Sequence, residues 1–305
     1  MASRFKVCEI GSTRYLLLQG QWEPEIADVM KQYRITHLRL NAPTERHARI
    51  DFLGELSFLE RVDLSALSVP DVSPLYELHG LRRLTISGIK KEIDFTRFPK
   101  LEELRIDWHP KFFSSVRACG QLRTLGIGNY NDADLQQFNN LQFLEELVVS
   151  RSRLENLAGV EHFPKLGRLS LDFAKRLETL EPLDACQELW YLTIDEAKNL
   201  RQIDPVSRLA NLRELCLKRC PEIESLRPIQ GAHALEYVGL LETTTIKDGD
   251  LSALLTLPML KHASFVDRKH YNHKNADFPK VFRGPNKLVV LYDSSLPAQA
   301  TSSIQ

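Results

Sequence analysis

An apolar pattern, L-x-x-L-x-L, recurs along this chain, and successive copies start 20 to 25 residues apart. A period in this range is typical of solenoids, in which each unit is a short strand followed by a return segment. One unit cannot bury its own apolar side, so neighbouring units stack and their leucines must recur at a fixed phase. The clear copies start at Leu59, Leu81, Leu101, Leu122, Leu144, Leu166, Leu189, Leu212 and Leu235, and weaker ones start at Ile35 and Leu260.

The segments between the copies carry a second periodicity. Apolar or small residues occupy nearly every third position after Leu154, Leu177, Leu200 and Ile223. A spacing of three is typical of a 3₁₀ or short helical turn with one buried face. A proline stands seven residues before the next unit's first leucine at Pro74, Pro182, Pro205 and Pro228, a place that suits the first residue of such a turn.

These repeats resemble the leucine-rich-repeat family over about Ile35 to Phe265, specifically the subclass of roughly 22 residues found in internalins and in a phosphatase-regulating repeat protein. The resemblance implies an α/β repeat solenoid, with a curved parallel sheet on the concave face and short helical or 3₁₀ returns on the convex face. One departure concerns the asparagine that usually follows each strand. Other residues stand in its place, namely Leu67, Ile89, Tyr130, Ser152 and Ala174, with Cys220 as a family-like substitute. We therefore expect no regular asparagine ladder.

A solenoid needs caps that cover its first and last units. We predict an N-terminal cap over residues 1–34, with strands at Phe5–Ile10 and Tyr15–Leu18 and an amphipathic helix that begins at Pro24. The repeats then occupy residues 35–267. A Gly284-Pro285 turn between two apolar runs predicts a closing hairpin in a C-terminal cap over residues 268–293. We expect residues 294–305 to form a disordered tail.

Composition narrows the possible settings of the protein. The 40 basic and 40 acidic residues cancel, so no net charge favours nucleic acid or membrane. No window reaches the roughly 18 apolar residues of a membrane span, and the start carries no long apolar signal segment. The five cysteines, Cys8, Cys119, Cys186, Cys216 and Cys220, are scattered and odd in number, which is typical of a reducing compartment. We expect a cytoplasmic protein.

Motifs of catalysis or cofactor binding are missing from the sequence. There is no Walker loop, H-E-x-x-H, G-x-S-x-G or C-x-x-C, and Gly126-Ile127-Gly128 lacks the third glycine of a dinucleotide fingerprint. Cys216 and Cys220, like His270 and His273, have spacings that could hold a metal, but thiol packing and solvated histidines are the simpler interpretations. We expect no enzyme, no cofactor and no metal, although His37, Asp63 and Arg105 could converge on one surface.

The outward positions of the strands are the best candidates for function. Side chains alternate along a strand, so the third, fifth and seventh positions of each unit should face away from the leucine core. Arginines recur in the early strands, whereas acidic residues and tyrosines gather in the later ones. We select as partner-binding residues Arg61, Arg83, Arg105, Trp108, Glu146, Arg168, Asp172, Phe173, Tyr191, Asp195, Glu214, Lys218 and Tyr237.

The leading functional prediction is a non-enzymatic module that binds another protein through this concave face. The family resemblance implies an inhibitor, an immunity-like neutraliser or a regulator, or else an adaptor or a phosphatase-regulatory subunit. The alternative is nucleic-acid or anion binding by the basic tract 268–287, where Tyr271, Phe278 and Phe282 lie among six Lys or Arg residues. A C-terminal cap with core aromatics and solvated lysines explains the same tract without any ligand.

Overall fold

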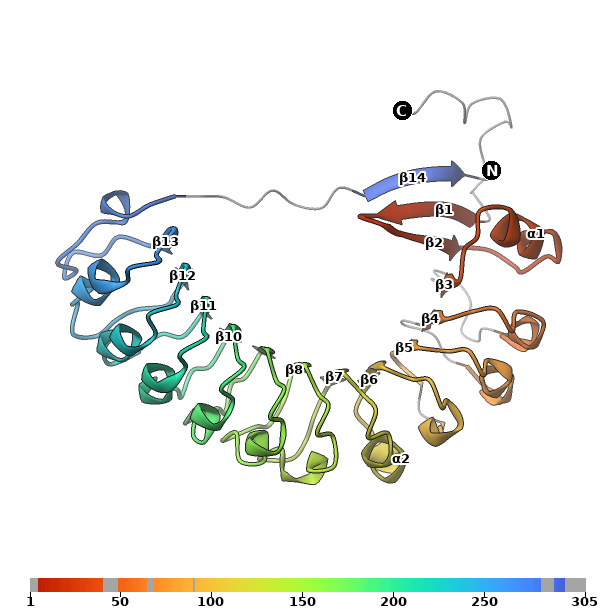
Figure 1. Cartoon of the computed structure of the whole chain (residues 1–305), viewed down its shortest axis with the longest axis horizontal. Helices are drawn as coiled ribbons and strands as arrows, with labels where there is room; N and C mark the ends of the chain where they lie inside the picture. The colour runs from red at the N-terminus through yellow and green to blue at the C-terminus, as the bar shows by residue number, and fades with distance from the viewer. Residues whose placement is uncertain (1–4, 41–48, 65–68, 90, 281–287, 294–305) are drawn as a thin grey trace. The chain divides into compact units, whose positions relative to one another are not determined.

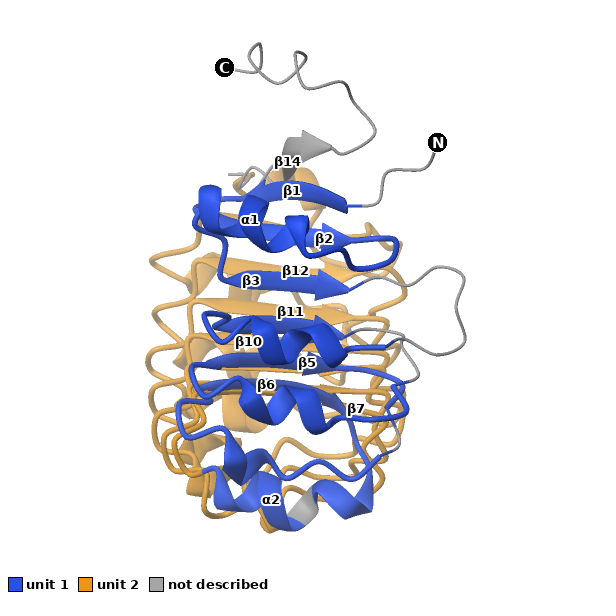
Figure 2. Ribbon diagram, turned by 90° about the vertical axis from the view of Figure 1, so that its right-hand side faces the viewer, with its two compact units in different colours: residues 1–119, 284–305 blue, residues 120–283 orange. Residues whose placement is uncertain are grey.

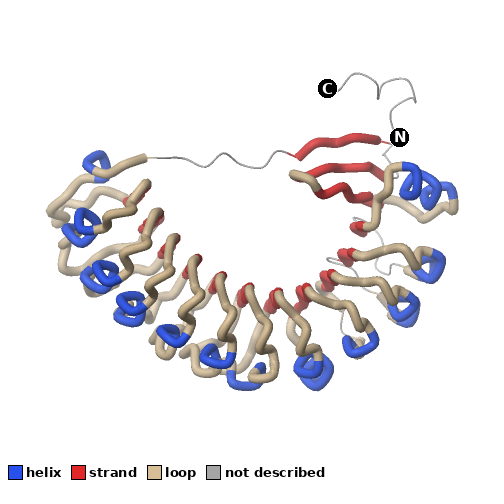
Figure 3. Tube along the Cα trace, viewed as in Figure 1, coloured by secondary structure: helices blue, strands red, loops and turns tan. Residues whose placement is uncertain are grey.

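The computed structural model describes residues 5–40, 49–64, 69–89, 91–280 and 288–293. The chain divides into two compact units: unit 1 comprises residues 1–119 and 284–305, and unit 2 comprises residues 120–283 (Figure 2). Both units consist of short strands joined by returns, and nearly every return contains a 3₁₀ or α-helical turn (Figure 3).

Unit 1 holds seven of the described strands and two α-helices. The strands are β1 (Phe5–Ile10), β2 (Thr13–Leu18), β3 (His37–Leu40), β4 (Arg61–Leu64), β5 (Arg83–Ile86), β6 (Glu103–Asp107) and β14 (Leu288–Asp293), and the helices are α1 (Glu25–Gln32) and α2 (Phe113–Ala118). The sheet order is β6-β5-β4-β3-β2-β1-β14 (Figure 1). Strands β2 to β6 run parallel, whereas β1 is antiparallel to both of its neighbours. The 3₁₀ turns of unit 1 are Asp51–Glu55, Ser73–Glu77, Phe95–Arg97 and Pro110–Phe112.

Unit 2 is a run of parallel strands in chain order. They are β7 (Thr124–Gly128), β8 (Glu146–Ser150), β9 (Arg168–Asp172), β10 (Tyr191–Asp195), β11 (Glu214–Lys218), β12 (Tyr237–Leu241) and β13 (His262–Phe265). Between and after them lie 3₁₀ turns at Gln136–Phe138, Val160–His162, Leu183–Ala185, Asp204–Arg208, Arg227–Gly231, Ser252–Thr256 and Asn275–Asp277. Parallel strands with 3₁₀ returns confirm the leucine-rich-repeat solenoid that the sequence predicts.

The register aligns equivalent positions of successive repeats. In unit 2, Leu192 pairs with Leu169 on one side and with Leu215 on the other. The fourth and sixth positions are buried in every described repeat, and the third, fifth and seventh are mostly half-buried. Slipping one strand by one residue would turn its leucines out of the core, so the repeated leucines enforce this register.

The chain leaves each strand of unit 2 in the same way. The residue after β7 to β12 has a positive φ of 50 to 58° and is never glycine, although this region disfavours other residues by about 1–3 kcal/mol. These residues, which we call the edge row, are Asn129, Arg151, Phe173, Glu196, Arg219 and Glu242. The N–H of Arg151 donates to the carbonyl of Asp172 in the next repeat at 2.8 Å, and Glu196 bonds to Lys218 in the same way. The inter-repeat ladder therefore continues through the turn and holds it in place.

Buried side chains at or next to the position of the missing asparagine contact the backbone of neighbouring repeats. Cys220 is buried, and its thiol approaches the carbonyl oxygens of Lys218 at 3.4 Å and Ile194 at 3.7 Å. Thr244 is also buried, and its hydroxyl accepts from the Cys220 N–H at 3.1 Å and donates to the Leu217 carbonyl at 2.9 Å. A threonine thus makes the double bridge between neighbouring repeats that an asparagine side chain could make.

The two ends of the chain differ in how closely they follow the sequence expectation. Strands β1 and β2 and helix α1 lie where the sequence predicts two strands and a helix, with Pro24 as the N-cap residue of α1. The expected C-terminal hairpin is not formed by β14, because this strand pairs with β1 in unit 1. The predicted turn at Gly284-Pro285 and the predicted disordered tail lie outside the described residues.

Gly159 is required by the packing of unit 2. It has a φ of 100°, and a Cβ built there would lie 2.4 Å from the backbone nitrogen of Gln136 in the preceding return. We expect Gly159→Ala to lower the free energy of unfolding by about 2–4 kcal/mol, from the backbone conformation and the clash together. Urea denaturation followed by circular dichroism measures this. Gly54→Ala is the matched control, because its Cβ would meet nothing closer than 3.9 Å; equal losses in the two variants would contradict the packing argument.

The Thr244 bridge gives a second prediction about stability. In Thr244→Val the Cys220 N–H and the Leu217 carbonyl lose their partner inside the core, so the free energy of unfolding should fall by about 1–3 kcal/mol. The neighbouring Thr243 is exposed, and Thr243→Val should change the free energy of unfolding by less than about 0.5 kcal/mol. A wild-type stability for Thr244→Val in thermal or urea unfolding would show that the bridge is not needed.

Candidate functional site

Outward side chains in the first half of each unit 2 strand lie side by side. The register places Glu146 next to Arg168, then Tyr191, Glu214, Tyr237 and His262, and we call this set the strand row. Two positions further along each strand the residues are small or short, namely Val148, Ser170, Thr193, Cys216, Gly239 and Ser264. The longer side chains of the strand row therefore lie beside a shallow strip of small residues, which we call the floor.

Arg168 is the centre of an aromatic cluster in the strand row. Its guanidinium carbon lies 4.1 Å from the ring centroid of Tyr191 and 4.8 Å from that of Trp190, and the two rings are 5.9 Å apart. A guanidinium at this distance from two rings is held by cation–π attraction. Gly167 makes room for the indole, because a Cβ there would lie 2.8 Å from Trp190 Nε1. The sequence analysis missed Trp190, which stands just before the outward positions.

A hollow of about 660 Å³ adjoins this cluster. Arg168 and Trp190 line it together with Lys165 and three glutamates, Glu145, Glu146 and Glu188. The acidic side chains at one end of the strands would favour a basic group on a partner.

The edge row carries a network of charges beside Phe173. Arg219 pairs with Asp195 and with Glu242, the latter at 3.1 Å, and its guanidinium carbon lies 5.5 Å from the ring centroid of Phe173. Lys218 also reaches Glu242 at 3.1 Å. Burial, and then the charge of Asp195, raises the pKa of Asp172. Phe173 is 43% exposed, so the network surrounds an accessible aromatic ring.

Two predicted contact residues are not on the surface. Asp195 is 8% exposed and is held by Arg219, so it orients that arginine instead of presenting its own carboxylate. Trp108 is also 8% exposed, because the chain after β6 packs its indole into the core of unit 1. Both residues are therefore removed from the predicted binding surface.

In unit 1 ion pairs engage most of the predicted arginines. Arg83 lies 3.0 Å from Glu103, and Arg105 lies 3.0 Å from the other oxygen of the same carboxylate. Arg39 pairs with Asp63 at 3.0 Å. Because Asp63 and Arg105 are used in separate ion pairs, the structure does not assemble them with His37 as an acid–base site. Arg61 has a different environment, described below with the pocket that it lines.

The other candidate sites have structural roles. No group of three or more metal-ligating side chains occurs among the described residues. His270 meets the Ile246 carbonyl at 3.0 Å, and His273 meets the Ser252 hydroxyl at 3.3 Å. Gly126 and Gly128 lie in strand β7. In the part of the chain that the structure covers, no helix is long and apolar enough to cross a membrane.

The basic tract 268–287 does not present its described aromatic rings to a ligand. Tyr271 is buried and its hydroxyl accepts from the Ile246 N–H at 3.0 Å, and Phe278 is buried against Phe265. Lys280 donates to Asn275 at 2.7 Å. Phe282 lies outside the described residues. The two described rings thus belong to the core, as expected for a cap.

Burial makes the cysteine thiols weak acids. It raises the pKa of Cys119 to about 11 and the pKa values of Cys186 and Cys220 to about 12. A pKa of 12 leaves a thiolate fraction of about one in ten thousand at pH 8, so iodoacetamide should modify these thiols slowly until the pH approaches their pKa or the chain unfolds. Peptide mass spectrometry of native and urea-treated protein measures this. Equally fast labelling of Cys186 in both states would contradict the buried environment.

The sequence matches no protein-family model, and a search of curated proteins finds no match. Solved structures of low identity share its architecture. An internalin of Listeria monocytogenes is 17% identical, with 83% of this chain and 87% of the internalin covered, at a TM-score of 0.48. A leucine-rich-repeat protein of Leptospira interrogans is 15% identical. The match covers 83% of this chain and 78% of the Leptospira protein, at a TM-score of 0.49.

The Arabidopsis receptor kinase HAESA, in its complex with the peptide hormone IDA and the co-receptor SERK1, gives a TM-score of 0.51 at 20% identity. That match covers 66% of this chain and 37% of the receptor chain. Similarity at this level concerns the fold alone. Together with the repeat register and the 3₁₀ returns, it shows that this chain has the leucine-rich-repeat fold.

Proposed function

We propose that the protein is a non-enzymatic module that binds another protein through the strand row and edge row of unit 2. The observation that carries this proposal is the cluster of Arg168, Trp190 and Tyr191, with Tyr237 further along the same row. Arginine, tyrosine and tryptophan are the residues that most often dominate binding energy in protein interfaces. Here the rings already hold the arginine in place, so little side-chain entropy is lost on binding.

The size of the surface indicates which residues a partner must reach. Six strands from β8 to β13 span about 24 Å, and five residues of strand span about 16 Å, which gives about 400 Å². A standard interface buries about 800 Å² on each partner. The strand row and its floor supply only half of this area, so the partner must also cover the edge row, where Phe173 is exposed.

The partner chemistry follows from the charges of this surface. Glu146 and Glu214 belong to the strand row, and Glu188 lines the adjoining hollow, whereas Glu145 also lines it but is paired with Arg123. A protein that presents basic side chains at its centre fits these carboxylates. HAESA, which is similar to this chain in fold alone, forms a complex with a peptide hormone and a co-receptor.

Inhibition or neutralisation of the partner is the role that we favour over tethering. A face of aligned strands joined by in-register hydrogen bonds can cover a partner's active surface without changing its own conformation. The adaptor and phosphatase-regulatory roles remain the alternatives within this proposal. None of the five cysteines forms a disulfide bond and four of them are buried, which supports our proposal of a reducing compartment such as the cytoplasm.

The proposal is tested by capture of the partner with the full chain and by measurement of its affinity. The variant Arg168→Ala/Tyr191→Ala/Tyr237→Ala should bind the captured protein at least about 30-fold more weakly, as expected when interface anchors are removed. The control is Arg227→Ala/Gln230→Ala, which changes exposed residues of a return segment in the same unit. Equal affinity for both variants would rule out the strand row, and an unchanged activity of the saturated partner would rule out inhibition.

A further inference from the structure

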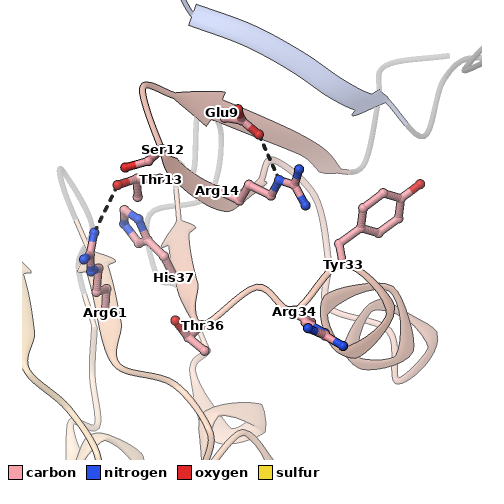
Figure 4. A pocket seen from close by; sticks show the side chains of 9 residues that line it. All are labelled: Glu9, Ser12, Thr13, Arg14, Tyr33, Arg34, Thr36, His37 and Arg61. Carbon is pink, nitrogen blue, oxygen red and sulfur yellow. Dashed lines mark hydrogen bonds and ion pairs between the residues drawn. The ribbon is translucent and has the colours of Figure 1, made fainter.

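A polar pocket of about 440 Å³ lies in unit 1, and none of its lining residues belongs to the strand row or the edge row. The turn between β1 and β2, the end of α1 and the starts of β3 and β4 surround it (Figure 4). We call it the hairpin pocket, and the residues that matter to its chemistry are Thr13, Arg14, Arg34, Thr36, His37 and Arg61. Its volume is within the range of small-molecule sites, about 300–1,000 Å³.

Positive charge exceeds negative charge in the lining of the hairpin pocket. Arg14 is neutralised by Glu9, whose carboxylate lies 2.8 Å from its Nε. Arg34 and Arg61 form no ion pair with any residue that the structure describes. Arg61 has a hydroxyl as its contact, because its Nη1 donates to Thr13 Oγ1 at 3.5 Å. Burial, and then the nearby charge of Arg83, lowers the pKa of Arg61. An anion in the pocket would relieve this unfavourable concentration of charge.

His37 adds a neutral polar group to the pocket wall. Burial, followed by the charge of Arg61, lowers its pKa to about 4, so the imidazole is uncharged at neutral pH. Its Nδ1 is buried and has no hydrogen-bond partner among the described residues. The uncharged ring can place its one N–H on either nitrogen and donate it to a ligand. The hydroxyls of Ser12 and Thr36 also line the pocket.

Arg34 stands where the backbone would favour glycine. The N–H of Ile35 donates to the Met30 carbonyl at 2.8 Å, and the N–H of Arg34 donates to the Lys31 carbonyl at 3.1 Å. This is the Schellman pattern at the end of a helix, whose left-handed residue is usually glycine. Arg34 has a φ of 53° at that position. Arg34 thus places a positive charge in the pocket lining at a backbone position that favours glycine.

We propose that the hairpin pocket binds the phosphate group of an organic phosphate at Arg61, beside His37 and Thr13, while Arg34 on the other side of the pocket adds to the positive potential (Figure 4). The guanidinium group of Arg61 can make paired hydrogen bonds to an oxyanion. The volume equals that of about fifteen water molecules, which leaves room for an organic group beside the phosphate. This inference does not rest on the protein-binding proposal, which concerns unit 2.

Calorimetric titration of the full chain tests the proposal, with inorganic phosphate and phenyl phosphate as probes at constant ionic strength. Both should bind, and phenyl phosphate should bind more tightly. Arg61→Gln should weaken binding about tenfold, as expected for the loss of a charge-assisted hydrogen bond, and Arg34→Gly should weaken it about threefold, because this residue acts through its charge alone. Arg34→Gly should melt no lower than the wild type, because glycine suits the left-handed conformation, so its loss of binding cannot be ascribed to unfolding.

Arg151→Gly is the matched control, since Arg151 is also exposed, has a φ of 50° and lies in unit 2. It should bind both probes as the wild type does. In a parallel NMR titration, bound phosphate should raise the pKa of His37, because the anion offsets the field of Arg61. The proposal is overturned by no binding at millimolar phosphate, by an unmoved His37 pKa, or by equal losses in Arg34→Gly and Arg151→Gly. Equal affinity for inorganic phosphate and phenyl phosphate would show that the pocket does not bind an organic group beside the phosphate.

Discussion

The in-register pairing of equivalent leucines is the constraint on which each unit depends. Every repeat places its fourth and sixth positions into the core beside the same positions of its neighbours, as Leu192 does between Leu169 and Leu215. This alignment brings the outward residues of different repeats together as well. The strand row is therefore a by-product of core packing: Glu146, Arg168 and Tyr191 are neighbours because the leucines behind them are. A solenoid can change its outward row freely while its core stays the same.

The turn after each strand shows how the repeats remain connected without an asparagine ladder. Backbone N–H groups of edge-row residues bond to the next repeat, and this ladder holds residues such as Arg151 and Glu196 in the left-handed region. Thr244 and Cys220 supply the side-chain contacts deeper in the core. The conformational cost at the edge row keeps large and charged side chains beside the strand face. Glycine would have a lower conformational free energy at these positions, but it would provide no side chain beside the strand face.

Charge has different consequences in the two units. In unit 1, Glu103 is shared by Arg83 and Arg105, so an apparent stripe of arginines is largely neutralised, and Arg34 and Arg61 are left to line the hairpin pocket. In unit 2, rings rather than carboxylates hold Arg168, which therefore keeps its charge available. Both proposals depend on an arginine that is held by rings or by a hydroxyl group, as Arg168 and Arg61 are, so that its charge can meet a group of a ligand.

The sequence alone determined the repeat, its phase and the inward and outward faces of the strands, because leucine burial at a fixed period is a local pattern with one packing solution. It also located β1, β2 and α1 within a few residues. Only the tertiary structure decided which outward residues are accessible. Asp195 has an outward position in the pattern and Trp108 directly follows one, yet Arg219 holds the first and the second is buried in the core of unit 1. The pairing of β14 with β1, the stacking of Arg168 on Trp190 and the hairpin pocket likewise join residues distant in the sequence or set by side-chain orientation, which the repeat period does not encode.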